Sequence, residues 1–416
     1  MKYNRSEIHQ KIFYGSILAI SFCIPIYGKL LPPLIALLGL NWLIEGKYIK
    51  TLPLVFKEKQ RFLVFSFSFL YFIYLIGLIY STNLQYARLD LGIKFSMLLF
   101  PLIFATSYFP DDWINGIGRI IRIFALGCIA ISIILYGHAL YNHAVLHVKD
   151  AFYYSNLSWF FHPAYLAMYM TFVISNIVFH LLLKQSVKGA LKKAVHILML
   201  VYFSVFVILL SSKAGLIALV FVILCYSLLL GFRYRKWIKA SSFLVISLVV
   251  LFMGLKVFPF ATGRISQAGK DLREQDTLMN SGRSTNDRIG IWKSSVDIIL
   301  THPLFGVGTG DVKDELLKEY KNNNIIPAFE QKLNAHNQYL QTFVATGLPG
   351  FLMLVSMILI PLWYSLRKEY YLYFFFLLIF GINILFESML EIQQGVIFYS
   401  FFNAILFSIK ENGNLR

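Results

Sequence analysis

Residues 211–233, SSKAGLIALVFVILCYSLLLGFR, decide the fold of this chain. Between Lys213 and Arg233 the segment carries no charge, and it has the length at which an apolar helix crosses a bilayer, about 17–25 residues. Runs of this kind recur along the whole chain, which is 58% hydrophobic and only 14% charged. A soluble domain carries about 25% charged residues. The composition therefore excludes a soluble globular protein and predicts an all-α, polytopic integral membrane protein.

The apolar runs predict about twelve transmembrane helices. We expect them at residues 12–28, 30–45, 62–80, 91–109, 118–141, 163–183, 195–212, 214–232, 240–260, 337–364, 371–389 and 394–409. No small-x-small cleavage site follows the first run before Lys29, so we interpret it as an uncleaved span.

The basic residues predict the orientation of these spans. The net charge is +17, which in a membrane protein indicates positive-inside loops and not nucleic acid. Basic clusters lie in four alternate loops, at residues 47–61, 184–193, 233–239 and 367–368. They fall on one side if both termini are cytoplasmic, and some would meet anionic lipid headgroups. We therefore expect a multi-pass protein of the inner membrane.

One long polar segment interrupts the spans and divides the chain into parts. We expect N-terminal spans over 1–194, further spans over 195–260, a large periplasmic loop over 261–336 and C-terminal spans over 337–416. The loop itself contains helical patterns. Ser284 or Asn286 is a suitable cap for a helix near 287–301, which His302-Pro303 would end.

Further details of the loop follow from its residue types. One face of its first helix carries Ile289, Trp292, Val296 and Ile299, so this helix is expected on the membrane surface or packed over the spans. A glycine-rich turn, Gly306-Val307-Gly308-Thr309-Gly310, comes next. Asp311 is then expected to cap a second short helix, about 312–320.

Polar side chains collect at the expected periplasmic ends of the spans and in the loop. An ionisable residue at membrane depth costs about 2.5–3.5 kcal/mol on insertion scales, so such residues tend to face a cavity or a partner. We take His336 and Arg288 as candidate catalytic residues. The candidate substrate-binding residues are His162, Lys213, Arg264, Arg283, Asn337 and Glu387.

Each candidate also has a purely structural interpretation. Lys213 can extend to the lipid headgroups, and Arg288 can pair with Asp287 or lie on a solvated helix face. Arg264 and Arg283 can be solvated or lipid-facing. His336 can be satisfied by backbone as an N-cap-like residue, and His162 can be structural. Glu387 can form a salt bridge with one of the cations, which would still place it in the same cavity.

The functional interpretation rests on the chemistry of a pyrophosphate leaving group. Arginine offers a planar fork for phosphate oxygens and lysine offers a point charge. A histidine can take a proton from an acceptor hydroxyl. This combination requires no metal or cofactor, and the sequence has no Asp-x-Asp, His-Glu-x-x-His or Walker motif. Its three cysteines show no Cys-x-x-Cys or Cys/His metal spacing.

Three segments resemble the O-antigen ligase and polymerase superfamily. Ser212-Lys213-Ala214-Gly215 is similar to the family's Ser-Arg-Gly-Ala turn. Arg288-x-x-x-Trp292 with His302-Pro303-Leu304-Phe305-Gly306-Val307-Gly308 is similar to its loop signature. His336-Asn337-x9-Gly347-x-x-Gly350 is similar to its last element. Lys213 departs from the usual arginine, and Phe351 replaces a threonine common in ligases.

The resemblance implies a metal-independent glycosyltransferase whose donor is an undecaprenyl-pyrophosphate-linked glycan. Arg288 and Lys213 would hold the pyrophosphate, and His336 would act as base or orient the acceptor. For an O-antigen ligase, the reaction we expect, the acceptor is lipid A–core. An O-antigen polymerase and a protein O-oligosaccharyltransferase share this chemistry and stay open as alternatives. A transporter or flippase is the alternative from another class, although no internal repeat is visible.

Overall fold

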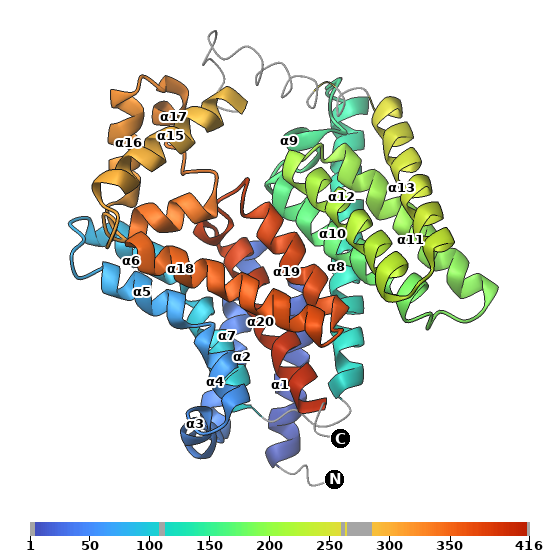
Figure 1. Ribbon diagram of the computed structural model, residues 1–416, viewed down its shortest axis with the longest axis horizontal. Coiled ribbons are helices and arrows are strands. Elements are labelled where there is room, and N and C mark those ends of the chain that lie inside the picture. Colours follow the sequence, from blue (N-terminus) through green and yellow to red (C-terminus); the bar gives the residue numbers. More distant parts are fainter. Residues whose placement is uncertain (1–4, 108–112, 259–262, 264–284, 414–416) are drawn as a thin grey trace.

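The computed structural model describes residues 5–107, 113–258, 263 and 285–413, and every regular element in these ranges is a helix (Figure 1). The first part of the chain contains α1 (Arg5–Cys23), η1 (Gly28–Leu30), α2 (Leu31–Glu45), α3 (Tyr48–Val55), α4 (Lys59–Ser66), α5 (Phe69–Gly77), α6 (Leu84–Lys94), α7 (Ser96–Thr106), α8 (Trp113–Ala144), α9 (Tyr154–Leu157), α10 (Pro163–Val178) and the π-helical turn η2 (Phe179–Leu183).

The second part continues with α11 (Ala190–Leu209), α12 (Lys213–Leu228), the π-helical turn η3 (Leu229–Arg233), α13 (Trp237–Val257), α15 (Thr285–Thr301), α16 (Val312–Asn322), α17 (Ile326–Glu330), α18 (Gln338–Arg367), α19 (Tyr371–Asn383), η4 (Met389–Glu391) and α20 (Gln393–Gly413). The multi-helix membrane protein expected from composition is therefore present.

The count of twelve spans is not reproduced. Within the described ranges, eight helical segments are long and apolar enough to cross a bilayer, or nine if the bent pair α4–α5 is one span. That pair bends by 42°, so the run expected at 62–80 is not one straight helix. The run expected at 371–389 also fails, because α19 ends at Asn383 and the chain turns before Glu387. An apolar run alone does not show where a helix breaks.

Aromatic side chains form the centre of the helix bundle. Phe124 of α8, Phe172 of α10, Phe376 of α19 and the pair Phe398 and Phe402 of α20 are all buried. The ring centroids of Phe124 and Phe402 lie 5.0 Å apart at an interplanar angle of 79°. Edge-to-face contacts of this kind add about 0.5–1.5 kcal/mol beyond burial of area. The four helices thus share one aromatic core.

Helices α15, α16 and α17 lie together at one end of the molecule, whereas α1 begins and α20 ends at the other end (Figure 1). Helix α15 confirms the helix expected near 287–301, and it stops immediately before His302-Pro303 as expected. Its buried positions include Ile291, Ser295 and Ile298. The face that carries Ile289 and Val296 is exposed instead, which is compatible with contact to lipid.

The glycine-rich turn after α15 fills a break in α18. Gly347 has φ 65° and ψ −159°, so the helical hydrogen bonds are interrupted there. The backbone N–H groups of Val307 and Gly308 donate to the carbonyls of Val344 and Ala345, at 2.8 and 3.0 Å. The N–H of Leu348 donates to Pro303 at 3.0 Å. The turn therefore satisfies backbone groups that the kink leaves without helical partners.

Asp311 occupies the N-cap position of α16 but makes no capping hydrogen bond. Its carboxylate instead accepts hydrogen bonds from the backbone N–H groups of Thr82 and Asn83, at 2.8 and 2.7 Å. Burial opposes its charge, but these hydrogen bonds lower the pKa of Asp311. Asp311, which was expected to cap α16, thus connects the loop to the residues immediately before α6.

Replacement of Gly347 by alanine is expected to destabilise the protein. The added Cβ would overlap the carbonyl of Leu304, and the backbone region that Gly347 occupies costs a residue with a side chain roughly 1–3 kcal/mol. Thermal unfolding in detergent should show a lower midpoint for Gly347→Ala. Gly137→Ala is the matched control, because its Cβ would meet no atom within 4 Å in the middle of α8. An unchanged midpoint for Gly347→Ala would contradict the role of the kink.

Candidate active site

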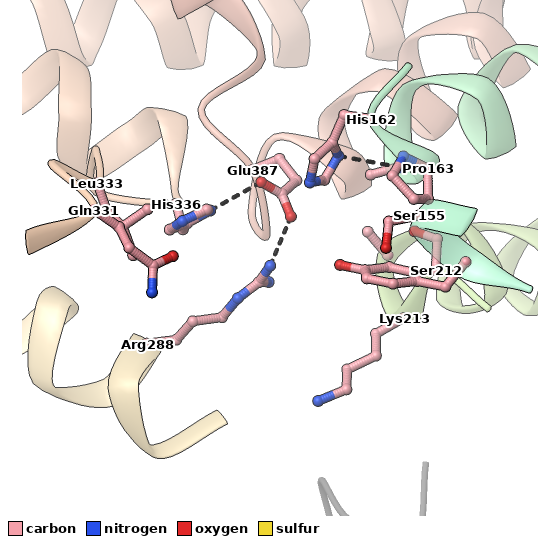
Figure 2. A pocket seen from close by; sticks show the side chains of 13 residues that line it. Ser155, His162, Pro163, Ser212, Lys213, Arg288, Gln331, Leu333, His336 and Glu387 are labelled. Carbon is pink, nitrogen blue, oxygen red and sulfur yellow. Dashed lines mark hydrogen bonds and ion pairs between the residues drawn. The ribbon is translucent and has the colours of Figure 1, made fainter. Parts of the chain in front are cut away.

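A cavity of about 270 Å³ brings together the polar residues that the sequence placed at span ends. Its walls come from α9, α10, α12, α15, the segment before α18, and the link between α19 and η4 (Figure 2). Five candidates line it: His162, Lys213, Arg288, His336 and Glu387. Segments more than 200 positions apart in the chain thus meet, since His162 and Glu387 line the same cavity.

The turn between α11 and α12 presents Lys213 to this cavity. Ser211 has φ 47°, in the left-handed region. Ser212 then caps α12, and its hydroxyl accepts a hydrogen bond from the N–H of Gly215 at 3.3 Å. A side chain at Gly215 would collide with Ala167 of α10, so glycine permits the close packing of α10 and α12. The turn therefore fixes where the lysine side chain starts.

The segment before α18 presents His336. This residue has φ 46°, and its backbone N–H donates to the side chain of Asn334 at 3.0 Å. A residue with a side chain costs about 1–3 kcal/mol in such a sparsely populated region, and such residues cluster at functional sites. Asn337 caps α18 by accepting from the N–H groups of Tyr339 and Leu340. Asn337 is thus the structural cap, and His336 is not.

Glu387 is the hub of the cavity, because its two oxygens bind two candidate residues. Arg288 Nη2 donates to Oε1 at 2.6 Å, and Arg288 Nη1 donates to the carbonyl of Phe386 at 2.9 Å. His336 Nδ1 lies 2.9 Å from Oε2. The Glu387 side chain is only 9% exposed. The salt bridge anticipated for Glu387 is confirmed, and the partner of Arg288 is Glu387, as Figure 2 shows.

The charges around Glu387 keep it ionised. Burial raises its pKa, but the hydrogen bond with His336 and the positive charges of Arg288 and His162 lower the pKa to about 2. An ionised carboxylate only accepts hydrogen bonds, so Nδ1 of His336 must carry the hydrogen. In a neutral imidazole the other nitrogen, Nε2, is then the basic one. The arrangement prepares His336 to accept a proton.

Arg288 keeps N–H donors that are not used in its bonds to Glu387 and Phe386. A guanidinium has five N–H donors, and the two bonds to Glu387 and Phe386 use one on each terminal nitrogen. Its side chain is 25% exposed. Lys213 enters the cavity from the opposite side (Figure 2). The planar guanidinium of Arg288 and the ammonium group of Lys213 therefore line the same cavity. Such a pair of cations suits phosphate oxygens.

His162 has a structural task as well as a place in the cavity. Its Nδ1 accepts a hydrogen bond from the N–H of Ala164 at 3.4 Å, which caps α10. Both interpretations of this residue are therefore compatible with the geometry. Arg264 and Arg283 lie outside the described residues, so their assignment stays a prediction. Sequence reasoning missed four lining residues: Tyr154, Ser155, Gln331 and Leu333.

A second buried polar cluster, also missed, holds the segment that carries Glu387. Lys94 of α6 forms ion pairs with Asp90 and with Glu391, the latter at 3.1 Å. Gln338 donates to Glu391 at 3.0 Å and accepts from the backbone N–H of Leu390 at 2.7 Å. Lys94 and Gln338 are fully buried. The polar pair Asn337-Gln338 at the head of an apolar span was the available signal.

No group of three or more His, Cys, Asp or Glu side chains placed to hold a metal ion occurs in the part of the chain that the structure describes.

The lowered pKa of Glu387 predicts a specific pH dependence of stability. A depressed pKa stabilises the fold above the ordinary value of 4.5, and this contribution falls as pH drops toward about 2. The stability difference between wild type and Glu387→Gln should stay constant above about pH 5 and shrink by on the order of 1 kcal/mol at pH 3.5. Denaturant unfolding in detergent measures it. Glu330→Gln, at an exposed position, should show no such trend; a pH-independent difference for Glu387→Gln would refute the assignment.

Removal of the buried lysine is expected to be severe. Lys94→Met leaves Asp90 and Glu391 buried without their cation, and breaking a buried pair costs about 3–5 kcal/mol. Thermal unfolding should show a large fall in midpoint. The triple variant Asp90→Asn/Lys94→Met/Glu391→Gln removes the uncompensated charge and should recover much of the loss. A triple variant no more stable than Lys94→Met would show that the cluster does not act through charge balance.

Comparison with known proteins finds a family and a relative that this chain resembles. Residues 198–355 match the family model described as O-antigen ligase, a range that contains Lys213, Arg288 and His336. An uncharacterized protein of Haemophilus influenzae is 25% identical over 352 residues, which cover 81% of this chain and 79% of the relative. His162 and Glu387 lie outside the matched range. Residues 198–355 are therefore similar to the O-antigen ligase family, and the chain is a multi-pass membrane protein.

Proposed function

We propose that this protein is an O-antigen ligase, which transfers a glycan from undecaprenyl pyrophosphate to lipid A–core at the periplasmic face of the inner membrane. The observation that carries the proposal is the cavity in which Glu387 holds Arg288 and His336 opposite Lys213. These side chains supply positive charge for a leaving pyrophosphate and a base for an acceptor hydroxyl.

The proposed reaction is a single displacement. The acceptor hydroxyl attacks the anomeric carbon of the donor sugar, and its proton passes to Nε2 of His336. A new carbon–oxygen bond forms while the bond to the pyrophosphate oxygen breaks. Arg288 and Lys213 stabilise the negative charge that develops on the departing polyprenyl pyrophosphate. Attack from the face opposite the leaving group inverts the anomeric configuration.

The hydrogen bond between Glu387 and His336 has two roles in this scheme. It selects the tautomer with a basic Nε2, and it stabilises the imidazolium that forms when the proton is taken. Arg288 balances the buried carboxylate, which keeps the carboxylate ionised throughout. The substrates themselves would supply the remaining specificity contacts.

An O-antigen polymerase is the second candidate, because the same cavity suits any acceptor hydroxyl. Phe351, in place of the threonine common in ligases, stacks on Phe343 with ring centroids 5.0 Å apart. Phe351 is half-buried and is not among the residues that line the cavity. This position does not favour the polymerase over the ligase, so the acceptor must be decided by assay.

Complementation of a ligase-deficient Gram-negative host that makes the matching glycan and core tests the proposal. Wild type should restore glycan-bearing lipopolysaccharide on a gel. Arg288→Ala and His336→Ala should each lower it by at least about 100-fold, the usual effect of removing a group that stabilises transition-state charge. His302→Ala is the matched control, since the His302 side chain is exposed and hydrogen-bonds to the neighbouring Thr301. Membrane levels of every variant are measured in parallel.

Each other outcome has a definite meaning. If wild type lengthens the lipid-linked glycan without loading the core, the protein is a polymerase. If Arg288→Ala and His336→Ala work as well as wild type at equal levels, this cavity is not the active site.

A further inference from the structure

A second cavity, of about 460 Å³, lies at the other end of the helices that form the candidate active site. Helix α10 with η2 starts at the active-site cavity and ends at Leu183, and α12 with η3 starts at Lys213 and ends at Arg233. Each of these two stretches has 21 residues, so each spans about 30 Å. That is the thickness of the hydrocarbon core of a bilayer. The second cavity therefore lies at the opposite membrane face.

The charged part of this cavity is basic. Lys188, Lys193 and Lys239 line it. Lys188 lies before α11, whereas Lys193 and Lys239 lie near the starts of α11 and α13. No carboxylate is among the described residues that line it. Glu369, at the same end of the molecule, is already paired with Arg233. Three lysines around one hollow favour an anionic group there.

The other part of the cavity is apolar. Leu181, Leu182 and Leu230 line it beside the lysines. Outside it, Leu191 of α11 and Ile238 of α13 are 79% and 85% exposed, a degree of exposure that suits contact with acyl chains. Trp237 packs against Gly231, where a Cβ would lie 2.7 Å from its ring. Tryptophan is enriched at the membrane interface, so the lysines lie at headgroup level.

We propose that this cavity binds an anionic diacyl phospholipid of the leaflet opposite the active site. The phosphate would lie among Lys188, Lys193 and Lys239, and the acyl chains would follow the leucines onto the apolar faces of α11 and α13. A free phosphate would contact the lysines but would have no apolar group to place against the leucines. The occupant is therefore a lipid headgroup, and basic pockets between membrane helices are known to take such groups. This site is independent of the reaction proposed for the first cavity.

Native mass spectrometry of the purified full-length protein tests the proposal. Wild type is titrated with phosphatidylglycerol, with phosphatidylcholine of the same chains, and with glycerol phosphate. The variants are Lys188→Gln/Lys193→Gln/Lys239→Gln and a charge-matched control, Lys50→Gln/Lys57→Gln/Lys59→Gln, whose lysines are also exposed. Thermal unfolding checks the fold of each.

Wild type and the control should bind phosphatidylglycerol with equal affinity. The triple variant at the cavity should bind it at least about tenfold more weakly, because each lysine beside an anionic headgroup adds to the binding free energy. The corresponding triple arginine variant should restore binding. If the glutamine variant does not fold, Lys193→Glu alone should weaken binding.

Three results would overturn the proposal. Equal binding by the wild type and the cavity variant places the lipid elsewhere. Equal binding of phosphatidylcholine and phosphatidylglycerol shows that charge is not recognised. Binding of glycerol phosphate as tight as that of the phospholipid identifies a free phosphate as the ligand.

Discussion

The pairing of one buried carboxylate with two cationic or proton-bearing groups holds the loop helices to the membrane helices. Glu387 is nearly enclosed, and an ion that loses its partner in such a place costs several kcal/mol. Arg288 reaches it from α15, and His336 reaches it from the segment before α18. Three parts of the chain that hydropathy cannot relate to one another are thereby forced to meet. The same constraint that closes the fold also places the groups needed for chemistry.

Helix α15 is held at both ends, which explains how a loop helix can position a charged side chain. At its start Arg288 binds Glu387 and the carbonyl of Phe386. Beyond its end the turn at Val307 and Gly308 is hydrogen-bonded into the kink of α18. His336 lies immediately before Asn337, the N-cap of α18, so α18 holds both the segment that carries His336 and the turn that follows α15. Pre-organised donors of this kind need no rearrangement when charge develops on a substrate.

The sequence selected residues that meet in one cavity, but its pattern of apolar runs does not give the spans of the structure. Lys213, Arg288, His336, His162 and Glu387 were selected because ionisable groups at membrane depth need partners, and all five line one cavity. The twelve-span count is not confirmed in the described residues, because apolar periodicity does not separate a helix that crosses the bilayer from one that ends or bends inside the protein. Asn337 caps α18, and its assignment to substrate binding stays a prediction. The cluster around Lys94 needed contacts between α6 and η4, which no local pattern contains.

Burial divides the cations of this protein into two groups with different physical uses. Arg288 and Lys94 are compensated by carboxylates, because a charge inside the protein is tolerated only with a partner. Lys188, Lys193 and Lys239 are exposed at the far ends of α10 and α12 and keep their full attraction for an anionic surface. The same two helices begin at one cavity and end at the other. Their length separates a site suited to chemistry from a site suited to lipid by the thickness of the membrane.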